Sequence, residues 1–144
     1  MTKLVLCLLV VATLVPVRST AQAPDAARLA GRWSGSGTFS DADVRKKVGS
    51  IPFAVEFKAD RSVTGRVGNA TLQDARMKSA RDLIEVRAKL TGSIGADPVL
   101  AKDYLVLLVT KVNDSTIRAE FHLKSNLTFD PRMREGRVVL TRVP

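Results

Sequence analysis

The sequence predicts an all-β protein: an antiparallel up-and-down β-barrel of about eight strands that follows a short helical turn. Two observations predict this fold. Apolar and polar residues alternate with a period of two along several stretches, and turn-forming residues separate these stretches at short intervals. Such alternation is typical of strands that bury one face and expose the other, as antiparallel sheets do. The eight predicted strands are 32–39, 53–58, 62–67, 70–77, 84–90, 104–109, 117–124 and 137–143.

The first part of the barrel follows from caps, alternation and turns. Asp25 is a good N-cap for the helix-forming residues 26–30, so we expect one helical turn there. In 53–58, large apolar side chains fall on one face, and small or charged ones fall on the other. Gly68-Asn69 is a good two-residue turn between the third and fourth strands. A longer connection without predicted structure spans 41–49.

Residues 73–87 allow two interpretations. Met77, Ala80, Leu83, Ile84 and Arg87 fit a helical period of 3.6 residues, but from Ile84 onward a charge occupies every outward position of a strand. The alternation favours a strand. If the helix forms instead, the count of eight strands fails.

The last part of the barrel contains one strand of a different kind. Residues 104–109 are apolar on both faces, so we expect a second layer to cover this strand on its outer side. Asn113-Asp114 joins it tightly to the alternating strand 117–124. Longer connections span 92–101 and 125–135.

The first 23 residues have the pattern of a secretory signal peptide. Lys3 precedes an apolar run over 4–15, and Ala21-Gln22-Ala23 forms an A-x-A cleavage pattern. We therefore expect a single domain over 24–144 that is exported to the periplasm or the extracellular space. Removing Lys3 and Arg18 lowers the formal net charge from +9 to +7.

Cysteine usage limits the chemistry of the exported domain. Cys7, the only cysteine, lies inside the apolar run of the signal, so residues 24–144 have no disulfide, thiol nucleophile or zinc–thiolate site. No second apolar run is long enough for a transmembrane helix.

The only tryptophan opens the first strand in the sequence Gly31-Arg32-Trp33. This resembles the G-x-W signature of the calycins, the superfamily of small barrels that includes lipocalins and avidins. Lys102-Asp103-Tyr104 is similar to the lipocalin T-D-Y motif with its threonine replaced. The resemblance implies that Trp33 closes one end of the barrel and that a basic residue of a late strand, here Arg142, packs across it. Closure is our main interpretation of Trp33, and contact with a ligand is the alternative.

Signals for catalysis are poor. His122 is the only histidine, and alternation places it on an outward face with charged neighbours. Glu56, Glu85 and Glu120 also fall on outward faces, which does not favour an acid–base pair of carboxylates. Because no nucleophile, metal-ligand or phosphate-loop spacing is present, we expect no catalytic residue, cofactor or metal. An active site assembled from loops stays open but is disfavoured.

Two binding hypotheses remain. In the first, the barrel carries a small hydrophobic or amphipathic ligand. In the second, the barrel is filled, and a basic surface binds an anionic envelope component or a protein partner. The volume inside the barrel distinguishes them. The expected inward ligand-binding residues of the first hypothesis are Trp33, Phe53, Phe57, Tyr104 and Phe121.

Two groups of basic residues suggest where the second hypothesis would act. They are Arg76, Lys78, Arg81, Arg87 and Lys89, and then Arg132, Arg134 and Arg137. A solvated surface is the alternative explanation of both. Nucleic acid is not an expected partner, because no exposed aromatic residues accompany these basic ones.

Overall fold

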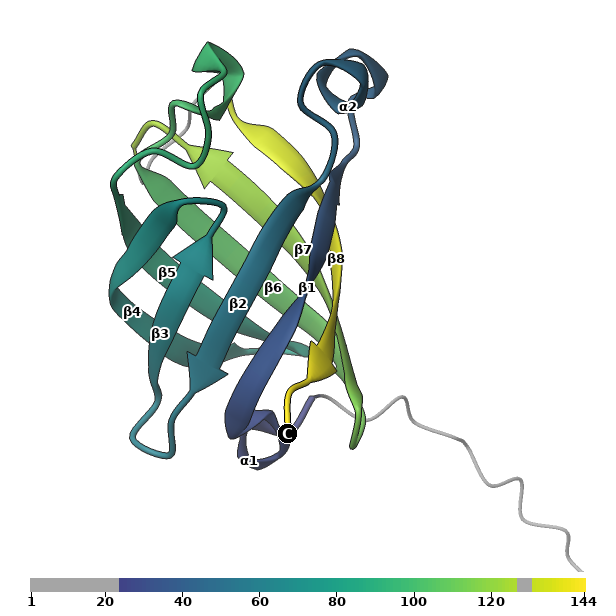
Figure 1. Ribbon diagram of the computed structural model, residues 1–144. Helices are drawn as coiled ribbons and strands as arrows, with labels where there is room; N and C mark the ends of the chain where they lie inside the picture. The colour runs from purple at the N-terminus through teal and green to yellow at the C-terminus, as the bar shows by residue number, and fades with distance from the viewer. Residues whose placement is uncertain (1–23, 127–130) are drawn as a thin grey trace, which may run out of the picture.

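Eight antiparallel strands close into a barrel in the computed structural model, which describes residues 24–126 and 131–144 (Figure 1). Each strand pairs with the next one in the sequence, and the last pairs with the first, so the predicted up-and-down barrel is confirmed. The proposed signal peptide lies outside the described residues. The strands are β1 (Gly31–Phe39), β2 (Ile51–Phe57), β3 (Ser62–Val67), β4 (Ala70–Ala80), β5 (Leu83–Thr91), β6 (Tyr104–Val112), β7 (Thr116–Lys124) and β8 (Arg134–Arg142).

The barrel core follows from the alternation of side chains along every strand. Most inward positions in the eight strands are apolar, and the apolar side chains that form the core have at most 7 % of their surface exposed. These side chains are Trp33 and Phe39 from β1, Ile51, Phe53, Val55 and Phe57 from β2, Val63 and Val67 from β3, Ala70, Leu72, Ala75 and Met77 from β4, Ile84, Val86, Ala88 and Leu90 from β5, Leu105, Leu107 and Val109 from β6, Ile117, Ala119, Phe121 and Leu123 from β7, and Val138 and Leu140 from β8.

Short helices lie at the two ends of the barrel (Figure 1). The expected helical turn is α1 (Ala26–Leu29), and the Asp25 carboxylate accepts a hydrogen bond from the Ala27 backbone N–H at 2.9 Å. At the opposite end lies α2 (Ala42–Val48), capped by Asp41. We expected 41–49 to be a connection without structure, so the helix in it was missed. A single 3₁₀ turn, η1 (Pro98–Leu100), lies in the connection between β5 and β6.

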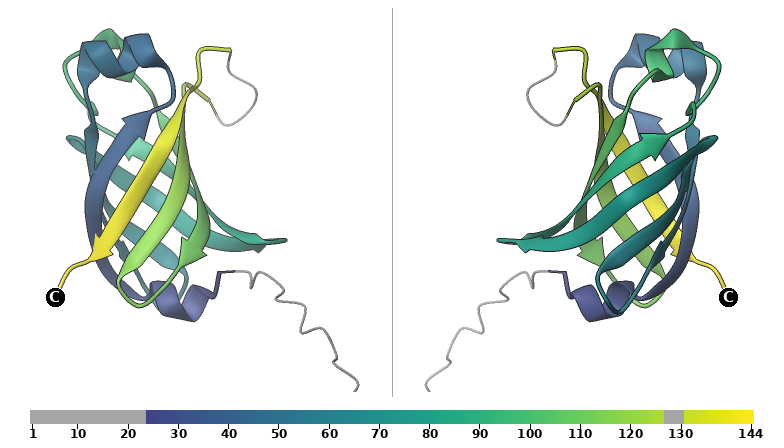
Figure 2. Two further views of the ribbon diagram at one scale, coloured as in Figure 1. Left: turned by 90° about the vertical axis from the view of Figure 1, so that its right-hand side faces the viewer. Right: turned by 90° about the vertical axis from the view of Figure 1, so that its left-hand side faces the viewer.

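Residues 73–87 form parts of two strands, so the helical interpretation is wrong. A tight turn at Arg81-Asp82 joins β4 to β5. Met77 and Val86 face each other across the pair and both point into the barrel. Met77 and Ile84, which fit a helical period in the sequence, therefore lie on the inner face of the β4–β5 hairpin. This hairpin projects beyond the rest of the barrel wall in Figure 2.

The outer face of β6 differs from the expectation. Its inward residues are Leu105, Leu107 and Val109, because they pair with inward residues of β7. Tyr104 is therefore on the outward face, in register with Lys124 and Lys89, and its expected inward position is wrong. Within residues 24–126 and 131–144, no helix covers this strand, since α1 and α2 lie at the barrel ends (Figure 1). Its outward apolar side chains are instead flanked by charged residues of β5 and β7.

Candidate functional site

Trp33 lies buried at the end of the barrel next to α1. Only 1 % of this residue is exposed, and its indole N–H donates a 2.7 Å hydrogen bond to the Leu29 carbonyl. The Arg142 guanidinium lies over the indole, 4.2 Å from the ring centre. Gly31 has a φ of +123°, and a Cβ there would lie 2.8 Å from Arg142 Nη1. The structure thus brings Gly31, Trp33 and Arg142 together, with a cation on the ring face.

Arg142 also joins three chain segments by its hydrogen bonds. Its guanidinium donates to the carbonyls of Arg28 at 3.0 Å, Ala30 at 2.8 Å and Asp114 at 2.9 Å. One side chain therefore connects the α1 segment and the β6–β7 turn to β8. Its hydrogen-bonding capacity is largely used within the chain.

Several phenylalanine rings are buried inside the barrel. Phe53, Phe57 and Phe121 are each at most 1 % exposed. The ring centre of Phe121 lies 5.4 Å from that of Phe39, in an edge-to-face arrangement, and 5.2 Å from that of Phe53. These distances are typical of packed aromatic pairs. Of the five expected ligand-binding residues, four thus point into the core and Tyr104 does not.

Two glycines show how tightly this part is packed. A Cβ at Gly37 would lie 2.6 Å from Phe53 Cε2 and 2.8 Å from Phe121 Cε1. A Cβ at Gly136 would lie 2.5 Å from Phe121 Cζ. Phe121 thus occupies the space that side chains on β1 and β8 would otherwise take. These close approaches leave no room for a ligand beside Phe53 and Phe121.

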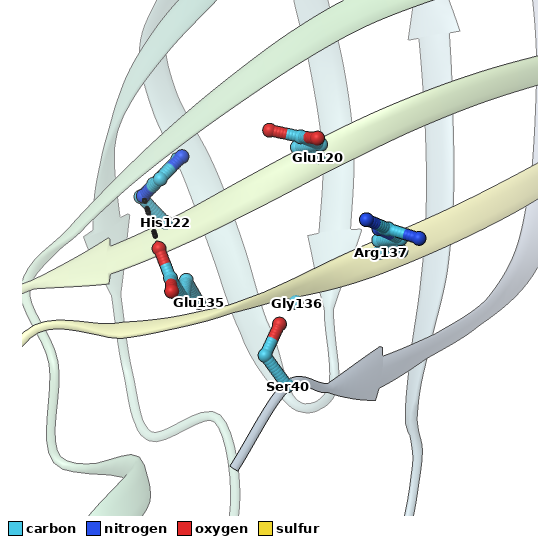
Figure 3. A pocket seen from close by; sticks show the side chains of 6 residues that line it. All are labelled: Ser40, Glu120, His122, Glu135, Gly136 and Arg137. Carbon is cyan, nitrogen blue, oxygen red and sulfur yellow. Dashed lines mark ion pairs between the residues drawn. The ribbon is translucent and has the colours of Figure 1, made fainter.

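A small polar depression of about 130 Å³ lies on the outer face of β7 and β8, and Figure 3 shows its lining. His122 points outward as expected, with its Nδ1 3.7 Å from Glu135 Oε2. Glu120 and Arg137 lie opposite each other beside this pair. His122 and Arg137 thus each face a carboxylate on the neighbouring strand. Among the lining residues, no nucleophile is hydrogen-bonded to a base.

A second depression, of about 290 Å³, lies on the outer face of β1, β2 and β3. Its lining includes the small residues Ser34, Ala54 and Gly65 and the charged residues Arg32 and Glu56. Gly65 has a φ of +140°, and a Cβ there would lie 2.1 Å from the Ala54 carbonyl oxygen. The glycine is therefore required by the close approach of two backbones.

The third depression, of about 360 Å³, lies on the outer face of β4 and β5. It is lined by Arg76, Lys78 and Arg87, together with Asp74 and Glu85. Sequence reasoning grouped the three basic residues but missed that Arg76 and Arg87 lie directly opposite each other. That register depends on a bulge between Gln73 and Arg76, for which the sequence offers only a weak signal.

Two carboxylates outside these depressions have perturbed pKa values. Hydrogen bonds from the Val44 and Asp43 backbone N–H groups lower the pKa of Asp41 below its usual 3.8. Hydrogen bonds from the Ser62 hydroxyl and then its backbone N–H lower the pKa of Asp60 in the same way. Both are exposed cap or turn residues, so the shifts reflect local structure.

Among residues 24–126 and 131–144, no three His, Cys, Asp or Glu side chains are grouped so that they could hold a metal ion. No helix in this part of the chain has the length and apolar character needed to cross a membrane. No protein-family model, curated protein or solved structure matches this chain.

Proposed function

We propose that this is an exported, non-enzymatic binding protein with a filled barrel, whose basic outer surface contacts an anionic component of the cell envelope. A small β-barrel fits a binding role, but barrels of this kind serve many unrelated functions. The observation that carries the proposal is the packed interior, because a filled barrel leaves its outer surface as the place where a partner binds.

The core residues argue against the carrier hypothesis. Phe53 and Phe121 touch each other, and Gly37 leaves no spare volume beside them. A ligand on the barrel axis would have to displace these rings and break their contacts, because protein cores are packed as densely as organic crystals. Most inward side chains are apolar and would not orient an amphipathic ligand. Arg134 of β8 is an exception, because it is in register with inward Leu123 and its Nε is buried without a hydrogen-bond partner.

The outer surface supports the choice of an anionic partner. Residues 24–144 carry a formal charge of +7, and several positive side chains lie on one face. We call this the β4–β5 basic face and define it by four exposed residues, Arg76, Lys78, Arg87 and Lys89. A positive face of this kind attracts anionic lipids or polymers, and its attraction falls as salt concentration rises.

A kinship with the calycins also belongs to this proposal. The observation that supports it is the pairing of Trp33 on the first strand with Arg142 on the last strand. The two residues are in register, and the Arg142 guanidinium lies over the indole ring. In this proposal the protein shares the fold of the ligand carriers but binds its partner on the outer surface of the barrel. Export rests on the signal-peptide pattern of residues 1–23.

The proposal is tested by two binding measurements on protein purified from its own host. The first titrates an environment-sensitive apolar dye and follows both the dye and Trp33 emission. The second measures co-sedimentation with phosphatidylcholine vesicles that contain either no anionic lipid or about 30 % phosphatidylglycerol, at about 0.05 M and about 0.5 M salt. We expect no dye binding, and binding only to anionic vesicles at low salt.

Two variants of equal charge locate the surface. In one, the four residues of the β4–β5 basic face are changed to glutamine. In the control, four exposed basic residues elsewhere are changed to glutamine: Lys46, Lys111, Arg118 and Arg137. The first should lose most of the vesicle binding and the control should lose less. Saturable binding of the dye, with a shift of Trp33 emission, would instead establish the carrier function.

A further inference from the structure

The strongest site on the β4–β5 basic face is the depression between two facing arginines. Arg76 of β4 and Arg87 of β5 are directly opposite in register, and both are exposed. Like charges placed directly opposite on an antiparallel pair repel each other and destabilise it. A residue pair that is unfavourable within the folded chain is favourable when an anion lies between the two charges.

The bulge in β4 determines this arrangement. Gln73 is in register with Lys89, and Arg76 is in register with Arg87, so Asp74 and Ala75 together face one residue of β5. Asp74 adopts a φ of +53°, and Ala75 points into the core. Without the extra residue, a different side chain of β4 would oppose Arg87. The bulge therefore places two guanidinium groups on one spot of the outer face.

The hydrogen bonds leave part of this cluster available to a ligand. Arg87 Nε donates to Glu85 Oε1, which holds the Arg87 side chain in place at its inner nitrogen. Among the described residues, neither Arg76 nor Lys78 has a hydrogen bond or an ion pair from its charged group. Asp60 is one carboxylate that competes for Arg76, since the positive charge of Arg76 contributes to lowering the pKa of that carboxyl.

Charge and shape then indicate the class of ligand. The depression has a volume of about 360 Å³ and is lined by three basic and two acidic residues, one of which is already paired with Arg87. A guanidinium presents a planar fork of donors that matches two oxygens of a phosphate, and a lysine adds a point charge. Two guanidinium groups on neighbouring strands therefore match a phosphate, whose oxygens point in several directions.

We propose that Arg76, Arg87 and Lys78 bind a phosphate group on the outer face of the β4–β5 hairpin. This inference rests on the proposed function and names the chemistry of its anionic partner. The hairpin projects from the barrel wall, so the site can reach a phosphate presented by a surface as well as one in solution (Figure 2). Asp74 and Glu85 line the same depression and repel an anion, so the three basic side chains must outweigh them.

The test uses protein purified from its own host and two probes. One is inorganic phosphate, titrated by calorimetry, and the other is phosphatidylcholine vesicles that carry phosphatidic acid. The variants are Arg76→Gln/Arg87→Gln, the charge-preserving Arg76→Lys/Arg87→Lys, and a control, Lys46→Gln/Lys111→Gln, that removes two exposed charges elsewhere. Urea midpoints show that each variant is folded.

We expect the glutamine variant to weaken binding about tenfold and the lysine variant about threefold, because lysine keeps the charge and loses the fork. The control should change it by less than about twofold. This pattern with inorganic phosphate identifies a soluble ligand, and the pattern with vesicles alone identifies a lipid headgroup. Either one supports the site.

Other outcomes overturn it. If the control weakens binding as much as the glutamine variant, or the lysine variant binds like the natural protein, the surface attracts anions without a site. That result would support the proposed function and contradict the phosphate site. If neither probe binds, and anionic vesicles of the earlier test also fail to bind, both proposals are wrong.

Discussion

The Arg142 guanidinium lies 4.2 Å from the centre of the Trp33 ring and donates hydrogen bonds to three backbone carbonyls in two other segments. The two residues belong to the strands that close the barrel, and they are in register with each other. A single pair thus joins the first strand, the last strand and the short helix that precedes them. Its contribution to stability can be measured directly.

Arg142→Ala removes the cation from the ring and leaves the three carbonyls to water. We expect a loss of about 1–2 kcal/mol in the free energy of unfolding, because the arginine is partly solvated. The loss in the free energy of unfolding should be smaller for Arg142→Lys, since an ammonium keeps the positive charge but cannot reach all three carbonyls. Urea unfolding followed by Trp33 emission measures both. Arg137→Ala, on the outer face of the same strand, should cost less than about 0.5 kcal/mol, and an equal cost would refute the role of Arg142.

Gly37→Ala should destabilise the protein by about 1–3 kcal/mol through overpacking. The new Cβ would lie 2.6 Å from Phe53 Cε2 and 2.8 Å from Phe121 Cε1. Phe121→Leu should relieve part of this cost when the two changes are combined, so the double variant should be more stable than the sum of the single effects predicts. Ser36→Ala, at the next and outward-facing position, is the control. Strict additivity would show that Gly37 and Phe121 do not compete for space.

Phe121→Ala should open a cavity where the rings of Phe39, Phe53 and Phe121 now pack together. We expect a loss of about 3–5 kcal/mol in the free energy of unfolding. The variant should also bind benzene-sized apolar molecules, because dry cavities lined by apolar side chains accept them. The natural protein should bind none. Nuclear magnetic resonance with dissolved xenon or benzene distinguishes the two, and equal uptake by the natural protein would contradict the filled interior.

Much of the fold could be predicted because charge alternation fixes both the strand and its inner face. Residues 84–90 and 117–124 carry this signal, and the strands found there have the expected faces. The stretch 104–109 does not, because residues apolar on both faces contain no information about which side is inward. Pairing of Leu105 and Leu107 with β7 decides it, and this pairing is not visible in the local sequence.

The other differences also arise from interactions that short patterns do not encode. The helix α2 has one buried apolar residue, Val44, and one half-buried, Val48, four positions later, which is too little periodicity to distinguish it from a loop. The facing pair of Arg76 and Arg87 depends on a bulge that shifts the register of β4. The basic composition of that region could be predicted from the sequence, and its geometry could not.

Arg76→Gln should leave stability unchanged or raise it by about 0.2–0.5 kcal/mol at low salt, because it removes one of two facing charges. The gain should disappear at high salt, where the repulsion is screened. Urea midpoints at two salt concentrations measure this effect. Lys78→Gln, whose partner in register is Glu85, is the matched control and should show no gain. A loss of stability in Arg76→Gln would mean that the arginine is held by favourable contacts within the chain.

Acid should weaken the start of α2. The pKa of Asp41 is lowered in the folded state, so its stabilising effect is complete above its unfolded pKa and is lost as pH falls through the lower, folded value. Asparagine can still cap the helix but does not titrate. Asp41→Asn should therefore be less stable than the natural protein near neutral pH, and the difference should shrink or reverse below the usual carboxyl pKa of 3.8. Urea midpoints at about pH 6 and about pH 2.5 check this, with Asp82→Asn in an exposed turn as the control. A constant difference at both pH values would show that the charge of Asp41 does not stabilise α2.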